Sequence, residues 1–234
     1  MSGPSIHVVT PTRGDRDERF LALCRMYASW QTRKPDKHWI IAYPPSTDKP
    51  DLVPRVRQGM EAAFADGADI VAIMEDDDYY GRRYLESVMW AWEHSGRPRL
   101  IGGSCGVQYH IGSRACGITM HEWPKPSALY MMAFHGMPES WPAEDSTHLD
   151  WHFMRSVHEA QYVCFPQWTV VGIKHGSGLC GGRRHFTMGA EEANDPDGEL
   201  LRDAIGDKLS RLYLSLGDEI RESQARHRLR SQGA

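Results

Sequence analysis

The sequence predicts an α/β fold: a single domain with an open, doubly wound sheet and helices on both faces. In the first hundred residues, short apolar runs alternate with segments of helical periodicity in the order β-α-β-α-β-α-β. The run 70–74 is continuously apolar, which is typical of a strand covered on both faces. The chain has 234 residues, 41% hydrophobic and 25% charged, as expected for a globular protein. A chain of this mass buries about 70% of its unfolded surface, enough for one sizeable core.

Each element of the first half has its own local signal. The expected strands are β-branched or apolar runs that stop at proline, glycine or acidic residues. The expected helices repeat apolar residues at spacings of three and four, and Gly67 stands where a helix would end. These signals place strands at 6–10, 39–43, 70–74 and 100–101, and helices at 18–30, 53–65 and 84–92.

The second half is less regular, and glycine-rich turns separate its apolar runs. From Gly198 onward, leucine and isoleucine at helical spacing predict one long amphipathic helix, followed by a basic, frayed end. The other expected elements are strands at 107–111, 116–120, 129–134, 162–165 and 168–173, and a helix at 149–158.

Charge and cysteine content exclude several classes of protein. The 27 Lys and Arg residues and 31 Asp and Glu residues leave a formal charge of −4. The five cysteines are widely spaced and form no CxxC pair, which argues against a disulfide framework and a zinc knuckle. No run reaches the ~18 apolar residues of a membrane span, and the start has no signal-peptide pattern. We therefore expect a cytoplasmic protein without an integral membrane segment.

Four consecutive acidic residues, Glu75 to Asp78, follow the buried strand 70–74 directly. The carboxyl end of such a strand is where open α/β sheets bind ligands. Clustered carboxylates require a counter-cation, and hard oxygen ligands suit Mg²⁺ or Mn²⁺. The alternative is a solvated acidic turn without a ligand.

The order of motifs resembles the inverting family 2 glycosyltransferases of the GT-A fold. Val8–Arg13 is similar to the family's first strand and nucleotide loop, and Ser29–Thr32 to its Ser-x-x-x-Gln-Thr helix end. Ser46–Asp48 resembles the tail of an Asp-Asp-Gly-Ser-Thr-Asp turn, and Met74–Asp78 a Leu-Asp-x-Asp-Asp strand end. Leu149–Arg155 is similar to the helix start Glu-Asp-Trp-Asp-Leu-x-x-Arg, which holds the family's catalytic base.

The resemblance implies a GT-A domain over 1–190, with a Rossmann-like open mixed sheet, a nucleotide-binding half (1–100) and an acceptor half (101–190). Residues 191–234 would form an amphipathic helix and basic tail on the same domain. The implied metal ligands, for Mn²⁺ or Mg²⁺, are Asp77, Asp78 and His175. The implied nucleotide-sugar contacts are Thr10, Pro11, Thr12, Arg13, Asp48, Glu75, Asp76, Arg183 and Arg184.

Asp150 is the implied catalytic base, and Asp145 is its rival. A carboxylate there would take the proton of the acceptor hydroxyl. Its alternative role is that of an acid in a helix's first turn, which the helix dipole favours. Trp123, Trp141 and Trp151 are candidates for aromatic surfaces that stack against the acceptor, although core packing explains aromatic residues equally well.

The expected function is metal-dependent transfer of a sugar, with inversion, from a nucleoside-diphosphate sugar, UDP-sugar favoured. The resemblance favours a saccharide or a lipid carrier as the acceptor. A hydroxymethylated DNA base is the second candidate, because a basic loop and tail could follow a phosphate backbone. One alternative is a metal-dependent nucleotidyltransferase, although the first loop lacks the expected glycines and lysine. The other is a catalytically inactive nucleotide- or glycan-binding module, since Glu75, Leu149 and the Pro44-Pro45 pair depart from the family pattern.

Overall fold

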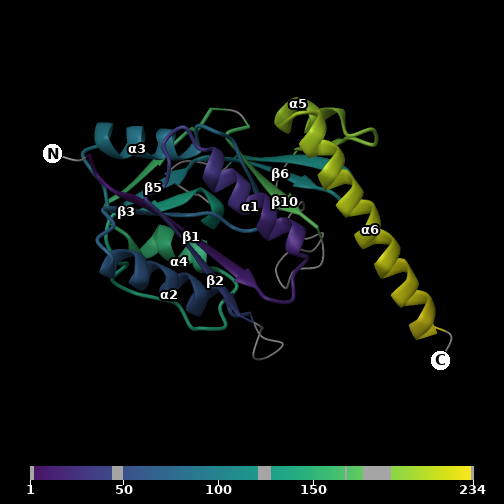
Figure 1. Ribbon diagram of the computed structural model, residues 1–234, viewed down its shortest axis with the longest axis horizontal. Helices are drawn as coiled ribbons and strands as arrows, with labels where there is room; N and C mark the ends of the chain where they lie inside the picture. The colour runs from purple at the N-terminus through teal and green to yellow at the C-terminus, as the bar shows by residue number, and fades with distance from the viewer. Residues whose placement is uncertain (1–2, 44–49, 121–127, 167, 176–190, 233–234) are drawn as a thin grey trace. The chain divides into compact units, whose positions relative to one another are not determined.

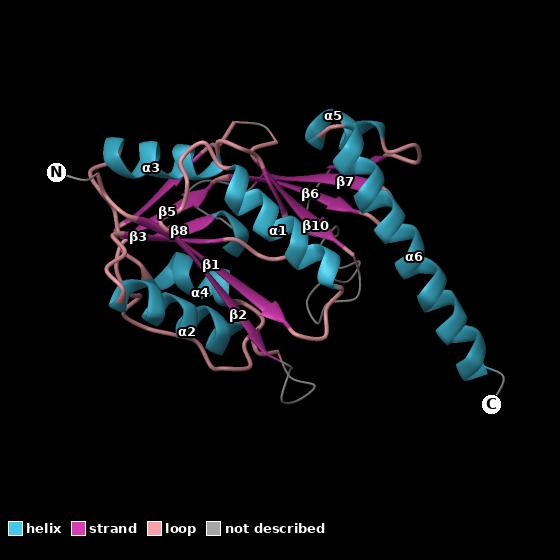
Figure 2. Cartoon of the chain, in the orientation of Figure 1, coloured by secondary structure: helices cyan, strands magenta, loops and turns pink. Residues whose placement is uncertain are grey.

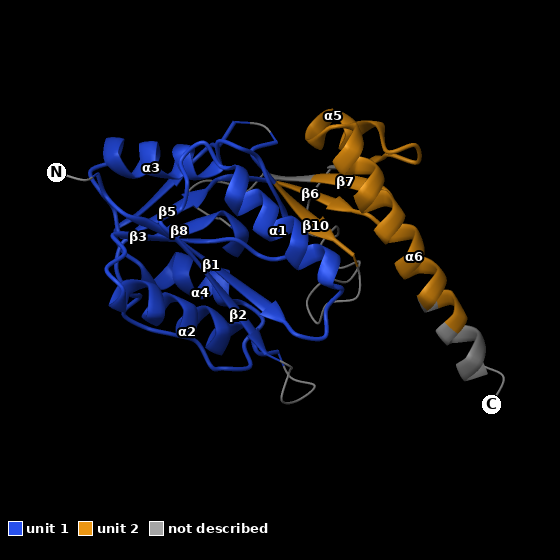
Figure 3. Cartoon of the chain, in the orientation of Figure 1, with its two compact units in different colours: residues 1–106, 120–170 blue, residues 107–119, 171–234 orange. Residues whose placement is uncertain are grey.

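The computed structural model describes all residues except 1–2, 44–49, 121–127, 167, 176–190 and 233–234. The chain divides into two compact units, shown in Figure 3. The first unit comprises Met1–Gly106 and Met120–Val170, and the second comprises Val107–Thr119 and Val171–Ala234. The functional halves expected on either side of residue 100 remain a prediction.

The first unit is built on a six-stranded sheet with the order β2-β1-β3-β8-β5-β9. Figure 1 labels β1, β2, β3 and β5 of this sheet. Strand β8 is antiparallel to both of its neighbours, whereas β1 pairs in parallel with β2 and β3, and β5 with β9. The sheet is therefore mixed, as expected. Its strands are β1 (Ile6–Arg13), β2 (Lys37–Tyr43), β3 (Ile70–Ile73), β5 (Leu100–Gly103), β8 (Met132–Phe134) and β9 (Ala160–Val163).

Helices cover both faces of this sheet (Figure 2). Val9 packs in one core cluster with Val56 of α2 and Phe153 of α4. The next residue, Thr10, contacts Cys24 of α1 instead, and successive strand residues point to opposite faces. The predicted α/β fold is thus confirmed. The elements are α1 (Glu18–Trp30), α2 (Leu52–Ala65), α3 (Tyr84–His94), α4 (Leu149–Ser156), the 3-10 turn η1 (Leu129–Met131) and the short strand β4 (Tyr79–Tyr80).

The second unit combines strands with two helices. Its strand order is β11-β7-β6-β10, in which β10 is parallel to β6 and β11 is antiparallel to β7. Buried Asp195 joins them to the helices, because it accepts hydrogen bonds from the Tyr109 hydroxyl (2.9 Å) and the Leu201 amide (3.2 Å). The elements are β6 (Cys105–His110), β7 (Ala115–Met120), β10 (Val170–Lys174), β11 (Glu191–Asn194), α5 (Glu199–Ile205) and α6 (Asp207–Gln232).

Several sequence predictions differ from the structure. The first half of the strand expected at 129–134 is the 3-10 turn η1, and the strand expected at 168–173 begins only at Val170. The single helix predicted from Gly198 is broken into α5 and α6 at Gly206, whose φ of 85° ends a right-handed helix. The predicted frayed tail instead continues α6 to Gln232. The strand predicted at 162–165 begins earlier, at Ala160, where β9 pairs with β5. In the described part of the chain, no helix is both long and apolar enough to cross a membrane.

Candidate functional site

The predicted nucleotide loop and the acidic cluster meet at one edge of the sheet. Strands β1 and β3 are parallel, with Val9 opposite Ile73, so the residues that follow Ile73 run beside the end of β1. There the Thr12 hydroxyl donates a hydrogen bond to the carboxylate of Asp76. Both side chains are buried. Parallel pairing therefore brings together two segments that lie 64 residues apart in the sequence.

Arg16, in the loop between β1 and α1, supplies a positive charge to the cluster. Its Nη1 contacts the carboxylate of Asp76 and lies 3.1 Å from Oδ2 of Asp77. The side chain of Asp76 is 1% exposed, that of Asp77 15% and that of Arg16 21%. Burial lowers the pKa of Arg16, but the carboxylates of Asp77 and Asp76 outweigh it and raise that pKa above its ordinary value. The sequence analysis missed this residue, because nothing in the sequence marks it except that it follows Arg13 by three residues.

The other acidic residues are attached to the core. The Glu75 amide donates a 2.7 Å hydrogen bond to the hydroxyl of Tyr80, which is fully buried, and burial raises the pKa of that hydroxyl. Asp78 is also fully buried, with a relative exposure of 0%. Tyr79 packs edge-on against Tyr27 with ring centroids 5.3 Å apart. This packing fixes the turn that carries the carboxylates.

The remaining residues of the predicted nucleotide loop have partners within the chain. The Thr10 hydroxyl lies 2.8 Å from Nε2 of His38 and 3.3 Å from Sγ of Cys24, inside the core. Pro11 is buried in β1. Arg13 makes two hydrogen bonds to Asp15, of 3.0 and 2.8 Å. Of this loop, Thr12 is the residue whose side chain reaches the acidic cluster.

Arg55, which the sequence analysis also missed, supports the end of β1 from helix α2. Its side chain is 1% exposed, and its Nη1 donates a 2.7 Å hydrogen bond to the carbonyl of Thr12. Its Nη2 pairs with Asp51, and its guanidinium carbon lies 3.7 Å from the ring centroid of Tyr43 at the end of β2. One buried cation therefore ties together the carboxyl ends of β1 and β2. An arginine inside an amphipathic helix gave no signal of this role.

The predicted base lies at the start of α4, which Leu149 and Phe153 anchor in the core. Asp150 is half-buried in the first turn of this helix, whereas its rival Asp145 is exposed in the preceding loop. Of the predicted acceptor tryptophans, Trp141 packs edge-on against Phe153, with ring centroids 5.3 Å apart.

Both described acceptor tryptophans have an arginine over the ring. The Arg57 guanidinium lies 4.9 Å from the Trp141 centroid, and that of Arg155 lies 5.2 Å from the Trp151 centroid. Trp151 is the more exposed, at 39%. Four predicted site residues, Asp48, Trp123, Arg183 and Arg184, lie outside the described residues.

The acidic cluster suits a divalent cation in charge and in ligand type. Four carboxylates and one guanidinium leave a formal charge of −3, and carboxylate oxygens are the ligands that Mg²⁺ and Mn²⁺ prefer. Among the described residues, no three His, Cys, Asp or Glu side chains converge on one point. The predicted ligand His175 is buried directly after β10, in the second unit.

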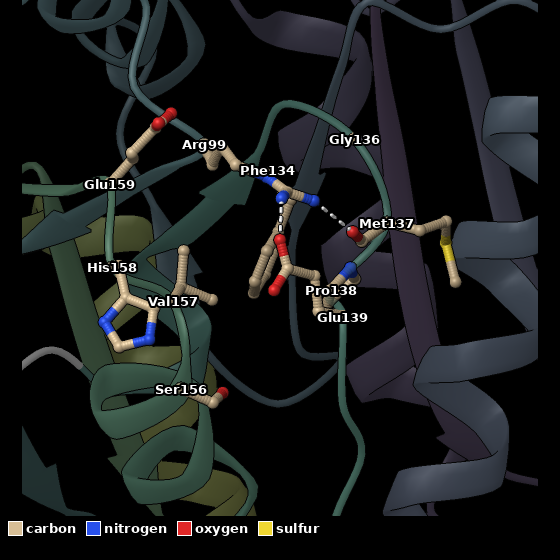
Figure 4. Close-up of a pocket in the computed structure, with 10 residues that line it drawn as sticks. All are labelled: Arg99, Phe134, Gly136, Met137, Pro138, Glu139, Ser156, Val157, His158 and Glu159. Atoms are coloured by element: carbon tan, nitrogen blue, oxygen red, sulfur yellow. Dashed lines mark hydrogen bonds and ion pairs between the residues drawn. The ribbon is translucent and has the colours of Figure 1, made fainter.

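A cavity of about 220 Å³ lies at the opposite edge of the same sheet (Figure 4). Arg99 and Glu159, which precede β5 and β9, line it together with the segment Gly136–Glu139. Arg99 pairs with Glu139 and donates a 2.8 Å hydrogen bond to the carbonyl of Met137. This cavity is separate from the acidic cluster, which follows the carboxyl end of β3.

No protein-family model matches the sequence, and no curated protein matches it. Among solved structures, S. aureus TarS 1–349 in complex with UDP-GlcNAc is similar, with a TM-score of 0.55 and 9% identity over 93% of this chain and 70% of that chain. TarS 1–349 in complex with UDP gives a TM-score of 0.49 and 9% identity over 74% of this chain, which spans 61% of that chain. A glycosyltransferase involved in the glycosylation of the major capsid of PBCV-1 gives a TM-score of 0.41 and 12% identity, over 69% of this chain and 82% of that chain. The first of these likenesses, at 9% identity, shows the fold: the chain has an α/β fold of the GT-A type.

Proposed function

We propose that this protein transfers a sugar from a UDP-sugar to an acceptor hydroxyl, with inversion and with the help of a divalent cation. The observation that supports this function best is the contact between Thr12 and Asp76, which joins the expected nucleotide loop to the acidic cluster. The fold adds support, because TarS, which shares it, was crystallised with UDP and with UDP-GlcNAc. Ligands of α/β sheets bind at this carboxyl edge.

In this proposal, the end of β1 and the acidic cluster bind the donor. Within the first unit, the residues that would hold Mn²⁺ or Mg²⁺ are Asp77 and Asp78. When bound, such an ion supplies positive charge that neutralises the departing diphosphate. Thr12 orients Asp76 through its hydroxyl, and Arg55 holds the main chain of Thr12 through a hydrogen bond to the Thr12 carbonyl. Both contacts keep the donor site in one geometry before the donor arrives.

The acceptor side of the proposal rests on helix α4. Asp150 takes the proton of the acceptor hydroxyl while that oxygen attacks the anomeric carbon. The bond between the anomeric carbon and the diphosphate oxygen breaks on the opposite face, so UDP leaves and the configuration inverts. Exposed Trp151, with Arg155 beside its ring, offers a stacking surface for a saccharide, the sugar of a lipid carrier or a hydroxymethylated DNA base.

Calorimetric titration of UDP, GDP and CDP with and without Mn²⁺ tests the donor site. We expect Mn²⁺-dependent binding of UDP, weakened at least about tenfold in Asp77→Asn, because the removed carboxylate belongs to the cation site. Asp15→Asn is the matched control, since it removes the same charge from an exposed residue that pairs with Arg13. Binding of none of the three nucleotides would refute the proposal.

Turnover by Asp150→Asn and Asp145→Asn identifies the base. We expect Asp150→Asn to lower kcat by about 10²- to 10⁴-fold at unchanged UDP affinity, because a positioned base contributes that much. UDP release would be measured with saccharides, lipid-linked sugars and hydroxymethylated duplex DNA as acceptors. A large loss in Asp145→Asn with full activity in Asp150→Asn would assign the base to Asp145 instead.

A further inference from the structure

Arg16 lies between Asp76 and Asp77, and Asp77 is a proposed ligand of the divalent ion. A single nitrogen, Nη1, contacts Asp76 and also lies 3.1 Å from Oδ2 of Asp77. A guanidinium nitrogen and a divalent ion cannot occupy the space between the same two carboxylates. Binding of an ion to these oxygens therefore requires that Arg16 first leaves them.

Arg16 is placed so that it can leave. It lies in the loop between β1 and α1, outside any helix or strand, and its side chain is 21% exposed, whereas Asp76 is 1% exposed. Asp76 also accepts a hydrogen bond from Thr12, so this carboxylate keeps one partner when the guanidinium moves away. The geometry of the cluster consequently does not depend on Arg16 alone.

The charge of the cluster favours such an exchange. The four acidic side chains Glu75 to Asp78 and the guanidinium of Arg16 together still have a formal charge of −3. A monovalent guanidinium compensates less of that charge than a divalent ion does. Arg16 therefore lowers the repulsion among the carboxylates while no ion is bound, and it opposes the ion's entry.

We propose that Arg16 is a built-in competitor of the divalent cation: it holds Asp76 and Asp77 in the ion's absence and must release Asp77, a proposed ligand, for the ion to bind. This inference rests on the proposed function, in which these carboxylates belong to the donor site. It makes Arg16 a positioning residue for the carboxylates, and it predicts that the free protein binds the ion more weakly than its four acidic residues would by themselves.

Titration of Mn²⁺ into the nucleotide-free protein tests the competition. We expect Arg16→Gln to bind Mn²⁺ about tenfold more tightly than the wild type, because the charge-assisted hydrogen bonds that oppose the ion are gone. If Arg16 instead ordered the carboxylates for the ion, the same substitution would weaken Mn²⁺ binding. The sign of the change thus separates the two roles. Arg19→Gln is the matched control, since Arg19 is three residues away and pairs with Asp17.

Thermal unfolding gives a second readout. Without Mn²⁺, Arg16→Gln should unfold at a lower temperature than the wild type, because buried Asp76 loses its cation. Saturating Mn²⁺ should raise the Tm of the variant more than that of the wild type, since the tighter ligand stabilises more.

If Arg16→Gln does not fold, Arg16→Lys takes over the test. The lysine keeps the charge on a compact ammonium that lacks the guanidinium fork, so we expect Mn²⁺ affinity to rise only about threefold. Unchanged or weaker Mn²⁺ binding in the folded variant overturns the inference, and so does a lack of Mn²⁺ binding in every variant. UDP titrated together with Mn²⁺ shows separately whether the donor site of the proposed function survives that result.

Discussion

Replacing Arg55 by methionine should destabilise the protein and loosen the end of β1. Methionine replaces the aliphatic part of the Arg55 side chain but cannot replace its guanidinium. The substitution therefore removes the hydrogen bond to the Thr12 carbonyl, the ion pair with Asp51 and the stacking on Tyr43. These three partners lie at or near the carboxyl ends of β1 and β2, where the donor is proposed to bind. A change in helix α2 is therefore expected to affect nucleotide binding.

The size of the effect follows from these contacts. Two hydrogen bonds made by a charged group contribute roughly 3–6 kcal/mol together. The side chain of Asp51 is 16% exposed and regains water, and the variant no longer buries a guanidinium, so we expect a net loss of about 3 kcal/mol. At about 2.1 cal/mol/K of unfolding entropy per residue, a 234-residue chain should lose about 6 °C in Tm.

Urea and thermal unfolding followed by circular dichroism would measure the loss, and UDP titration would measure the weakened donor site. Arg57→Met is the matched control in the same helix. The guanidinium of Arg57 lies over the ring of Trp141, and we expect its loss to lower the free energy of unfolding by about 1 kcal/mol or less. A double-mutant cycle with Asp51→Asn should give a coupling of at least about 1 kcal/mol. A loss below about 1 kcal/mol in Arg55→Met, or a coupling near zero, would refute the reasoning.

Two further predictions concern the core. Burial, aided by the charge of Arg25, lowers the pKa of His38 from 6.5 to about 4, so the folded state resists protonation. Stability is full above pH 6.5 and falls towards pH 4; urea unfolding should show about 2 kcal/mol lost between pH 7.5 and pH 5, and a flatter profile in His38→Gln. A Cβ on Gly217 of α6 would lie 2.4 Å from the carbonyl oxygen of Ile111, so Gly217→Ala should cost about 1–3 kcal/mol in the same assay. An unchanged pH profile in His38→Gln, or an unchanged Gly217→Ala, would contradict these readings.

The sequence predicted the first half of the fold closely because its signals are local. The helix expected at 18–30 is found at those residues, since apolar side chains at helical spacing and the Asp17 cap specify it without distant contacts. Periodicity could not predict the break at Gly206, because leucines at the same spacing continue on both sides of it. The two-residue strand β4 was missed because a run of two residues has no period.

The candidate site also has a part that the sequence predicts and a part that it does not. That Thr12 and Asp76 would meet follows from parallel strands, which end at one edge whatever their loops do. The partners of Arg16 and Arg55 depend instead on where a loop and a helix bring a long side chain, and no spacing in the sequence encodes that. Sequence reasoning therefore located the carboxylates but not the arginines that balance and support them.

The charge at this edge connects the proposed ion, the donor and Arg16. A nucleoside-diphosphate sugar brings further negative charge to a cluster whose formal charge is already −3 with Arg16 in place. Nucleotide alone would increase the repulsion, and the ion alone must displace Arg16 from Asp76 and Asp77. Under the proposed function, each ligand would thus remove the obstacle that the other meets: the ion would offset the charge of the diphosphate, and the displaced guanidinium would pair with the diphosphate. By linkage, UDP should tighten Mn²⁺ binding by the same factor as Mn²⁺ tightens UDP binding. That factor should be smaller in Arg16→Gln than in the wild type, because the variant has no guanidinium to displace.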